Sequence, residues 1–202
     1  MQRHYFFKSC LAASALLCAG SIASGYELSE GSRYFGGQFA MLDYDISGAN
    51  ESYEPTALVA RMGLFVQDNV AIEGRIGTGL SSDKKYYTYS DADEEVAVEL
   101  DSLLGLFVIA HMPLEGTGSF YGALGLSRVR TSVEEDDYWY SNYFGDMHFN
   151  DTYTVSDTGL SYGVGFEWHM SDVSALNIEY MMYVNESDYS VAALSVGASF
   201  GF

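Results

Sequence analysis

The last stretch of the chain, Ser190–Phe202 (SVAALSVGASFGF), decides the fold because its side chains alternate between two kinds. One face carries Leu194, Val196, Ala198, Phe200 and Phe202, and the other carries Ala193, Ser195, Gly197, Ser199 and Gly201. A period of two is that of a β-strand. An apolar face opposite a small or polar face is typical of a strand with lipid outside and a packed, polar lumen inside. The pattern continues to the terminal aromatic and predicts a transmembrane β-strand.

Seven further segments alternate in the same way, and polar or Gly-rich breaks separate them. They are Tyr34–Ile46, Thr56–Val66, Val70–Leu80, Val96–His111, Phe120–Thr131, Thr158–Met170 and Ala175–Val184. Short connections at 67–69, 112–119 and 171–174 alternate with longer or more polar ones at 47–55, 81–95, 132–157 and 185–189. This asymmetry predicts an all-β, eight-stranded antiparallel up-and-down transmembrane barrel with short periplasmic turns and longer extracellular loops.

The sixth segment shows the two faces most clearly. Leu160, Tyr162, Val164, Phe166 and Trp168 share the face assigned to lipid, and Gly, Ser, Glu and His residues share the other. Trp168 falls near the periplasmic end, where interfacial aromatics are enriched. We therefore predict Trp168, Phe200 and Phe202 as interface aromatics. The first segment is ambiguous because both of its faces are mostly apolar.

Residues 1–24 have the pattern of a signal peptide. Arg3 and Lys8 precede an apolar stretch, and cleavage after Ala23 or after Gly25 fits the small residues that follow. The predicted domains are the signal peptide, 1–24, and an outer-membrane barrel, 25–202. Both cysteines lie in the leader, which excludes disulfides, thiolate zinc sites and cysteine nucleophiles from the rest of the chain.

The chain is strongly acidic. The formal net charge is −19, so removing Arg3 and Lys8 leaves −21. This charge argues against nucleic-acid partners. The runs 91–95 and 134–137 match no calcium-loop spacing, so we expect solvated charge or loose divalent bridging to lipopolysaccharide phosphates rather than a metal site. Arg128 and Arg130, near the outer rim, are candidates for direct pairing with those phosphates. No cofactor is expected.

At this point a family resemblance is evident. The stretch 159–169 (GLSYGVGFEWH), then 176–180 (LNIEY), then the aromatic end 199–202 resembles the small eight-stranded outer-membrane barrels of the OmpA, OmpX and opacity-protein type. The resemblance covers residues 33–202. It implies a bacterial outer-membrane location and recognition of the C-terminal strand by the barrel-assembly machinery. It implies little about function, because such barrels include adhesins, evasion factors and enzymes.

The short turns predict a charge network inside the barrel. Arg61 and Arg75 lie equally far from Asp68 and fall opposite each other, with Glu73 as a diagonal neighbour. Glu167 and Glu179 lie equally far from Val173 and are expected to be opposite as well. Across an eight-stranded ring, the two arginines would face the two glutamates. The predicted network is Arg61, Glu73, Arg75, Glu167 and Glu179. A structural plug is favoured over a gated pore, since such a lumen is just wide enough for side chains to fill.

The third outer loop combines acidic residues with aromatic ones. Its candidate contact residues are Tyr138, Trp139, Tyr140, Tyr143 and Phe144. Exposed aromatics either pack or bind a ligand. Two interpretations stay open: contact with a host surface or a sugar, and packing of the aromatics among themselves or against Tyr86, Tyr87 and Tyr89. The second is favoured.

Enzymatic activity is not expected. Some small barrels with lipid A deacylase activity carry a Ser, His and acid set, and His169 and Ser171 with Glu179 resemble it superficially. The predicted register places this set at the periplasmic end, away from outer-leaflet lipid A. With His111 near a turn and His148 in a loop, no Ser–His–acid set is expected to converge, and no catalytic residue is assigned.

The sequence thus predicts a monomeric outer-membrane barrel with a structural or surface-interaction role, through envelope integrity, adhesion or surface contact. The alternative is a narrow channel gated by the interior Arg and Glu residues, and a lipid-modifying enzyme comes third. The expected partners are outer-membrane lipid, lipopolysaccharide, the barrel-assembly machinery and a host or surface ligand at the loops.

Overall fold

The computed structural model describes residues 28–46, 52–88, 92–115, 118–139, 147–187 and 189–202. The strands are β1 (Arg33–Ile46), β2 (Ser52–Tyr53), β3 (Thr56–Gln67), β4 (Val70–Ser81), β5 (Asp83–Thr88), β6 (Ala92–Leu114), β7 (Gly118–Trp139), β8 (Met147–Ser171), β9 (Ser174–Asn185) and β10 (Tyr189–Gly201). No helix in these ranges is long and apolar enough to cross a membrane. The predicted signal peptide, 1–24, lies outside the described residues.

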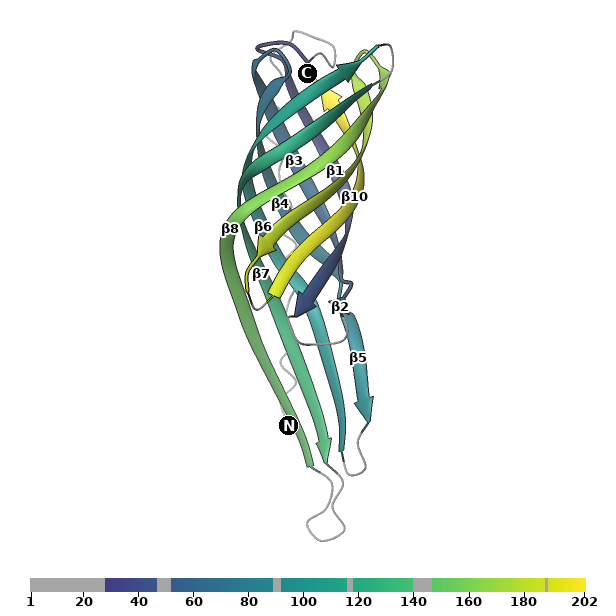
Figure 1. Cartoon of the computed structure of the whole chain (residues 1–202). Coiled ribbons are helices and arrows are strands. Elements are labelled where there is room, and N and C mark those ends of the chain that lie inside the picture. The colour runs from purple at the N-terminus through teal and green to yellow at the C-terminus, as the bar shows by residue number, and fades with distance from the viewer. Residues whose placement is uncertain (1–27, 47–51, 89–91, 116–117, 140–146, 188) are drawn as a thin grey trace.

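Eight long strands close into one antiparallel barrel (Figure 1). Their order is β10-β9-β8-β7-β6-β4-β3-β1, and β1 pairs with β10 to complete the ring. The predicted all-β, up-and-down, eight-stranded barrel is confirmed. The short connections β3–β4, β6–β7 and β8–β9 lie at one end, which we call the short-turn end, and β10 also ends there. We call the opposite end the mouth.

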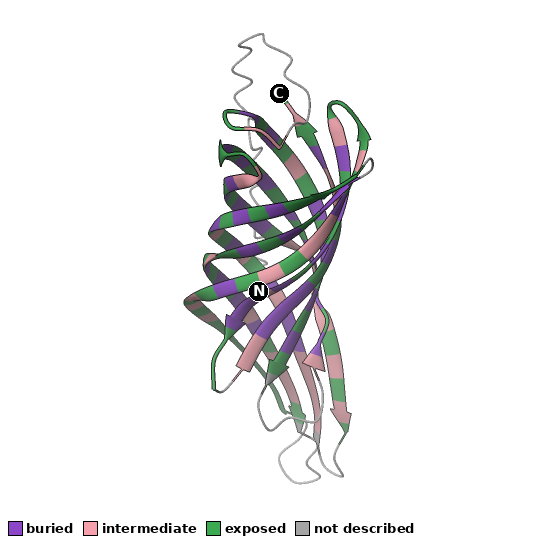
Figure 2. Cartoon of the chain, turned by 45° about the horizontal axis from the view of Figure 1, so that its top comes forward, coloured by how far each residue is buried: buried purple, intermediate pink, exposed green. Residues whose placement is uncertain are grey.

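Burial alternates along the strands (Figure 2). Along β3, for example, Ala57, Val59 and Arg61 are buried, whereas Leu58 and Met62 are exposed. Since successive side chains of a strand point to opposite faces, one face of every barrel strand lines the lumen. The same alternation resolves the ambiguous β1: Phe35 and Phe39 are exposed, and Tyr34 and Gln38 are buried.

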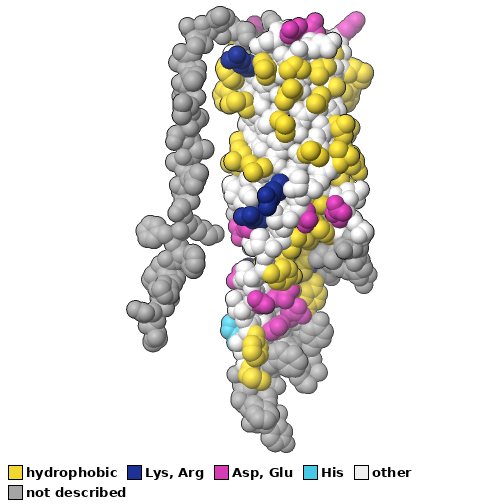
Figure 3. All heavy atoms as spheres, turned by 90° about the vertical axis from the view of Figure 1, so that its left-hand side faces the viewer, with side chains coloured by type: hydrophobic (Ala, Val, Ile, Leu, Met, Phe, Trp, Pro, Cys, Tyr) yellow, Lys and Arg dark blue, Asp and Glu magenta, His cyan; other side chains and the backbone are white. Residues whose placement is uncertain are grey.

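Exposed apolar side chains form a band on the face of the barrel seen in Figure 3, and every barrel strand carries such side chains. This apolar belt includes Phe35, Phe39, Met62, Ile76, Leu106, Leu124, Leu126, Val164, Ile178, Leu194, Val196 and the predicted interface aromatics Trp168, Phe200 and Phe202. The ring of Phe35 lies 5.7 Å from that of Phe200 and 5.9 Å from that of Phe202, so these aromatics form a cluster at the short-turn edge. A continuous apolar exterior of this kind suits a lipid environment.

The predicted strand ends agree with the structure to within three residues, except at the mouth ends of β6, β7 and β8. There the strands continue past the barrel as an open sheet, with β5 at its edge (Figure 1). We call this sheet, residues 83–88, 92–100, 131–139 and 147–155, the extension. The prediction that 81–95 and 132–157 are loops is therefore wrong for most of their length. Their acidity suggested loops, but their Tyr, Val and Thr residues favour strands, and the ladders of the barrel continue into them.

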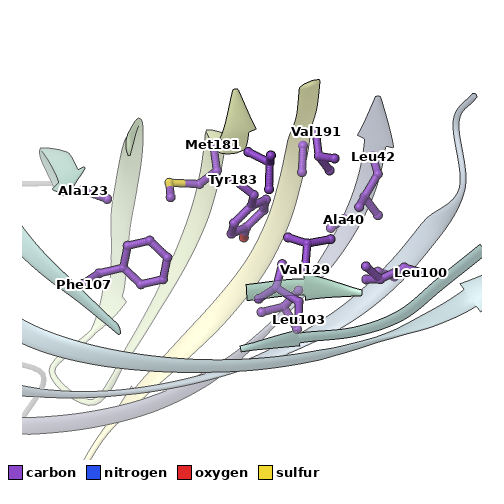
Figure 4. Packing of buried hydrophobic residues seen from close by; sticks show 14 of the residues in the cluster. Ala40, Leu42, Leu100, Leu103, Phe107, Ala123, Val129, Met181, Tyr183 and Val191 are labelled. Carbon is purple, nitrogen blue, oxygen red and sulfur yellow. The ribbon is translucent and has the colours of Figure 1, made fainter. Parts of the chain in front are cut away.

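The lumen beneath the mouth holds a packed apolar layer (Figure 4). Phe107, Met181 and Tyr183 point into the space that the strands enclose, and Leu100 and Leu103 lie further towards the mouth. All five side chains are buried. Between this layer and the short-turn end, the lumen contains charged and polar side chains, which form the first part of the candidate site.

Candidate functional site

Four charged side chains form a closed cluster in the middle of the lumen. Nε of Arg61 donates to Oε2 of Glu73 at 2.7 Å, and Nε of Arg75 donates to Oε1 of Glu73 at 2.6 Å. Both terminal nitrogens of Arg75 reach across the lumen to Glu179, at 2.6 and 2.7 Å. The four side chains are fully buried and their formal charges cancel. We call Arg61, Glu73, Arg75 and Glu179 the central cluster.

Register accounts for the central cluster. The β3–β4 ladder pairs Arg61 directly with Arg75 and places Glu73 opposite Gly63, one diagonal step away. Two like charges opposite each other are unfavourable unless a counter-charge compensates. Glu73 is bound by both guanidinium groups, and Glu179 from β9 makes a bidentate pair with Arg75, which is the strong geometry for a carboxylate.

Aromatic side chains enclose the central cluster. The hydroxyl of Tyr34 donates to Oε2 of Glu73 at 2.5 Å, and the guanidinium of Arg61 lies 5.4 Å from the centre of the Tyr34 ring. The guanidinium of Arg75 lies 4.6 Å from the centre of the Phe107 ring. Gly63 makes room for Tyr34, because a Cβ atom there would lie 2.2 Å from the ring. The site is therefore tightly filled.

Glu167 does not lie where the sequence argument placed it. The prediction that Glu167 is opposite Glu179 is wrong: the β8–β9 ladder pairs Glu167 with Asn177 and Gly165 with Glu179. A register shift between His169 and Ser171 displaces the pairing. Oε1 of Glu167 lies 3.4 Å from Nε2 of His169, so this carboxylate belongs to a second polar group nearer the short-turn end.

That second group brings together a serine, a histidine and an acid, which the sequence argument did not expect. Oγ of Ser119 lies 3.0 Å from Nδ1 of His111, and Ser119 pairs with Glu167 in the β7–β8 ladder. All three side chains are buried. Spacing along the chain failed to show the group because its members come from β6, β7 and β8. The hydrogen bond to Ser119 satisfies one nitrogen of the buried His111 ring, whereas Nε2 of His111 has no hydrogen-bond partner among the described residues.

The set that resembled a deacylase is not assembled. Ser171 lies at the turn between β8 and β9, where its hydroxyl forms a hydrogen bond of 2.7 Å with the hydroxyl of Ser174. His169 lies next to Glu167, whereas Glu179 pairs with Arg75. The third histidine considered, His148, lies on the extension with Nε2 3.1 Å from Oδ1 of Asp136.

The outer face of the extension carries carboxylates that have polar partners. Nζ of Lys84 lies 2.5 Å from Glu95, and Nδ2 of Asn150 donates to Asp136 at 2.7 Å. The hydrogen bonds from Asn150 and His148 lower the pKa of Asp136 below its usual value. Lys84 supplies a positive charge to Glu95, and Asn150 and His148 supply hydrogen bonds to Asp136.

The candidate aromatic contacts are only partly described. Tyr138 is exposed on the extension and stacks on His148, with ring centres 4.3 Å apart. Trp139 is the last residue of β7. Tyr140, Tyr143 and Phe144 lie outside the described residues, as does Tyr89.

A cavity of about 510 Å³ lies at the mouth, where the barrel meets the extension. Five tyrosines from five strands line it, together with valines and two glutamates; the lining is Tyr44, Tyr53, Tyr87, Glu94, Val96, Val98, Val133, Glu135, Tyr153, Val155 and Tyr189. We call this space the mouth cavity. The cavity could not be predicted from the sequence, because most of these residues fall in predicted loops and no two of the tyrosines share a strand.

Hydrogen bonds and burial hold the mouth cavity in shape. The hydroxyl of Tyr153 donates to Glu135 at 3.0 Å, and burial together with this bond raises the pKa of Tyr153 to about 12. Tyr189 donates to Asp157 and stacks on Tyr44, with ring centres 5.4 Å apart. Burial and the nearby Asp137 and Glu135 raise the pKa of Glu94.

The remaining predicted residues lie on the outer surface. Arg128 and Arg130 are exposed on β7, and Figure 3 shows Lys and Arg side chains at the mouth edge of the apolar belt. Nε of Arg128 donates to Oγ of Ser156 at 3.0 Å. Across the described ranges, no group of three or more His, Cys, Asp or Glu side chains is arranged to hold a metal ion.

Comparison with known proteins agrees with this architecture. Residues 9–202 match the family model for the outer membrane protein beta-barrel domain. Among curated proteins, none matches the sequence significantly.

Solved structures share the fold at low identity. The attachment invasion locus protein Ail of Yersinia pestis is 15% identical, with a TM-score of 0.55 over 86% of this chain and 99% of that one. Neisserial surface protein A is 17% identical, with a TM-score of 0.57 over 86% of this chain and 100% of that one. OprG from Pseudomonas aeruginosa is 14% identical, with a TM-score of 0.50 over 89% of this chain and 98% of that one. Ail has also been crystallised with the heparin analogue sucrose octasulfate.

Proposed function

This chain belongs to the outer membrane protein β-barrel family and is an outer-membrane protein, and from this premise we propose that its barrel anchors the extension as a surface for contacts outside the cell. The observation that carries the proposal is the continuation of β6, β7 and β8 past the mouth as a paired sheet. Short turns face the periplasm in proteins of this kind, so the extension projects outwards.

The extension is built as an ordered surface. Every residue of β5 pairs with β6, and the β6–β7 and β7–β8 ladders run unbroken over the extension to Ala92, Trp139 and Met147. A sheet of paired strands holds its exposed side chains in fixed positions, which lowers the entropic cost of binding. Tyr138 and its stacked partner His148 supply an aromatic surface of the kind that contacts a sugar or a protein.

The barrel itself is proposed to be a plug and an anchor. The central cluster and the apolar layer above it fill the cross-section with buried side chains. This supports a structural role for Arg61, Glu73, Arg75 and Glu179 rather than the alternative of a gated channel, and it leaves the extension as the part available for contacts. Arg128 and Arg130 are proposed to pair with lipopolysaccharide phosphates at the edge of the apolar belt.

The negative charge of the extension bears on the charge of the ligand that it can bind. The solved Ail complex contains a sulfated sugar, which is an anion. The outer face of the extension carries Asp93, Glu95, Glu134 and Asp136. An anionic glycan would be repelled by these carboxylates, so the surface favours neutral or cationic partners.

A shortened variant tests the proposal. Ser132 pairs with Thr154, so replacing residues 133–153 by Asn-Gly joins the two strands by a hairpin turn of favoured sequence. The wild-type protein in nanodiscs, probed on an array of neutral, amino and sulfated sugars, should bind neutral or amino sugars, and the shortened variant should not.

Heat-dependent gel mobility serves as the folding control, and it should be the same for both proteins. Equal binding by the folded variant would show that the contact surface lies outside residues 133–153. Binding by neither protein, or binding of sulfated sugars alone, would contradict the proposed role. We also propose that the protein is not a lipid-modifying enzyme, so lipid A mass spectra from cells with and without the gene should be identical.

A further inference from the structure

We propose that the mouth cavity is a binding site for a small organic cation with an alkyl body, such as a linear polyamine. The inference concerns the inner face of the extension and does not depend on the surface contacts proposed above. It rests on the lining of the cavity, on the distribution of charge between the two faces of the extension, and on one ammonium group already placed against the lining.

The lining suits an ammonium group with an alkyl chain. The rings of Tyr44, Tyr53, Tyr87, Tyr153 and Tyr189 and four valines provide apolar walls, and Glu94 and Glu135 provide the charged groups. Aromatic faces attract cations through their negative quadrupole, and binding pockets commonly combine apolar walls with a few placed polar groups. A volume of about 510 Å³ is within the range of small-molecule sites.

Carboxylates on the inner face lie opposite one another. Glu94 pairs with Asp137 across the β6–β7 ladder, and Glu135 pairs with Asp151 across the β7–β8 ladder. All four belong to the face that lines the cavity, because they alternate with the residues of the outer face. Directly opposed like charges are unfavourable without a counter-charge. Within the described part of the chain, none of these four carboxylates forms an ion pair with a basic side chain.

The outer face of the same strands differs in this respect. There Glu95 forms an ion pair with Lys84, and Asp136 is contacted by Nε2 of His148 and accepts a hydrogen bond from Asn150. Lys84 thus gives one outward carboxylate a cationic partner, whereas no described basic side chain, the inner-face Lys85 included, forms an ion pair with the four inward carboxylates, and in the proposed site these take a cation from outside. Their arrangement is not that of a metal site, because the described residues hold no group of three or more metal ligands.

An ammonium group already lies against one wall. Nζ of Lys85 lies 5.1 Å from the centre of the Tyr53 ring. The hydroxyl of Tyr53 lies 3.5 Å from that of Tyr87, so the two rings lie side by side at this wall. The Lys85 contact shows that the tyrosines accept an organic ammonium at cation–π distance.

Paired variants test the proposal by calorimetric titration of the refolded protein with spermidine at 0.15 M salt. Glu94→Gln with Glu135→Gln removes two inward charges, and Glu95→Gln with Glu134→Gln removes two outward charges from neighbouring positions. The inward pair should weaken binding by about tenfold or more, as expected when charged hydrogen bonds are lost. The outward pair should change binding by less than about twofold, because exposed charges are screened.

A second pair of variants tests the aromatic wall. Tyr44→Leu should weaken spermidine binding by about fivefold through loss of a cation–π contact, and Tyr44→Phe should leave it unchanged. Equal losses from the inward and outward charge pairs would show nonspecific attraction and overturn the proposal. So would the absence of spermidine binding to the folded wild-type protein, or equal displacement of spermidine by Mg²⁺ at matched ionic strength.

Discussion

At the scale of single residues, the central cluster makes the sharpest stability prediction. Arg61→Ala leaves Glu73 with one guanidinium instead of two in a fully buried site. Removing one member of a buried ion pair typically costs about 3–5 kcal/mol. Arg128→Ala removes an exposed arginine and should cost less than about 1 kcal/mol. Urea unfolding in lipid bilayers measures both, and equal losses would show that the cluster does not stabilise the barrel.

Gly63 offers an independent test of the same site. In Gly63→Ala, the new Cβ atom would lie 2.2 Å from the ring of Tyr34, so the ring must move and its hydrogen bond to Glu73 is lost. We expect a loss of about 1–3 kcal/mol in the free energy of unfolding. Gly74→Ala, on the neighbouring strand, has open space around its Cβ position and serves as the control. Equal effects would mean that Tyr34 is loosely held.

The raised pKa of Glu94 predicts a pH-dependent effect. Because the pKa is raised in the folded state, the contribution of Glu94 to stability is present at low pH and is lost as pH rises through the folded-state pKa. At pH 7.5, Glu94→Gln should therefore stabilise the extension by about 0.5 kcal/mol, the usual size of one cross-strand like-charge pair. Hydrogen exchange of β6 should show slower opening in the variant at pH 7.5 and no difference at pH 4.

Residue-level prediction from the sequence succeeded where the predicted centre of the turn matches the register of the ladder. The centre at Asp68 gives the Arg61–Arg75 pairing. The ladder reaches this pairing through a register shift between Phe65 and Gln67 beside the turn, where Asn69 adopts a positive φ of 64°. The pairing of Glu167 was missed because the turn pairs Ser171 with Ser174 and the ladder shifts between His169 and Ser171. Glu167 therefore lies opposite Asn177, two residues from Glu179. Nothing in the local sequence marks that irregularity.

At the scale of elements, the eight barrel strands were predictable because seven alternate clearly between two kinds of side chain and the first, although apolar on both faces, ends at a polar break. The extension was not, because its acidic residues suggested solvated loops while its Tyr, Thr and Val residues follow the period of a strand. The mouth cavity was missed for a related reason: it requires the extension and draws its tyrosines from five strands.

The extension should be less stable than the barrel from which it grows. It has an acidic outer face and open edges, which makes local opening easier than in the closed ring. Limited proteolysis should cut within 83–100 or 131–157 and leave a folded, heat-modifiable barrel. Cleavage within the barrel strands at a similar rate would indicate that barrel and extension open together.

At the scale of the whole molecule, the filled lumen predicts an electrically silent barrel. In the proposed plug, the central cluster and the apolar layer with Phe107, Met181 and Tyr183 would block the path from the short-turn end to the mouth. In planar bilayers, the refolded protein should give no steady conductance steps, with folding verified by gel mobility. Reproducible steps that change in Arg75→Ala would favour the channel alternative.

The barrel strands end at unequal heights around the mouth, so the mouth is closed by the extension on one side and open on the other. On one side β6, β7 and β8 rise well beyond the barrel, whereas β1, β9 and β10 stop near its rim (Figure 1). A molecule that travels along the sugar layer of the cell surface can cross the low rim, but one that comes from behind meets the sheet. With the mouth outwards, as proposed, the strands leave it open on the side of β1, β9 and β10, so a ligand would enter parallel to the membrane from that side.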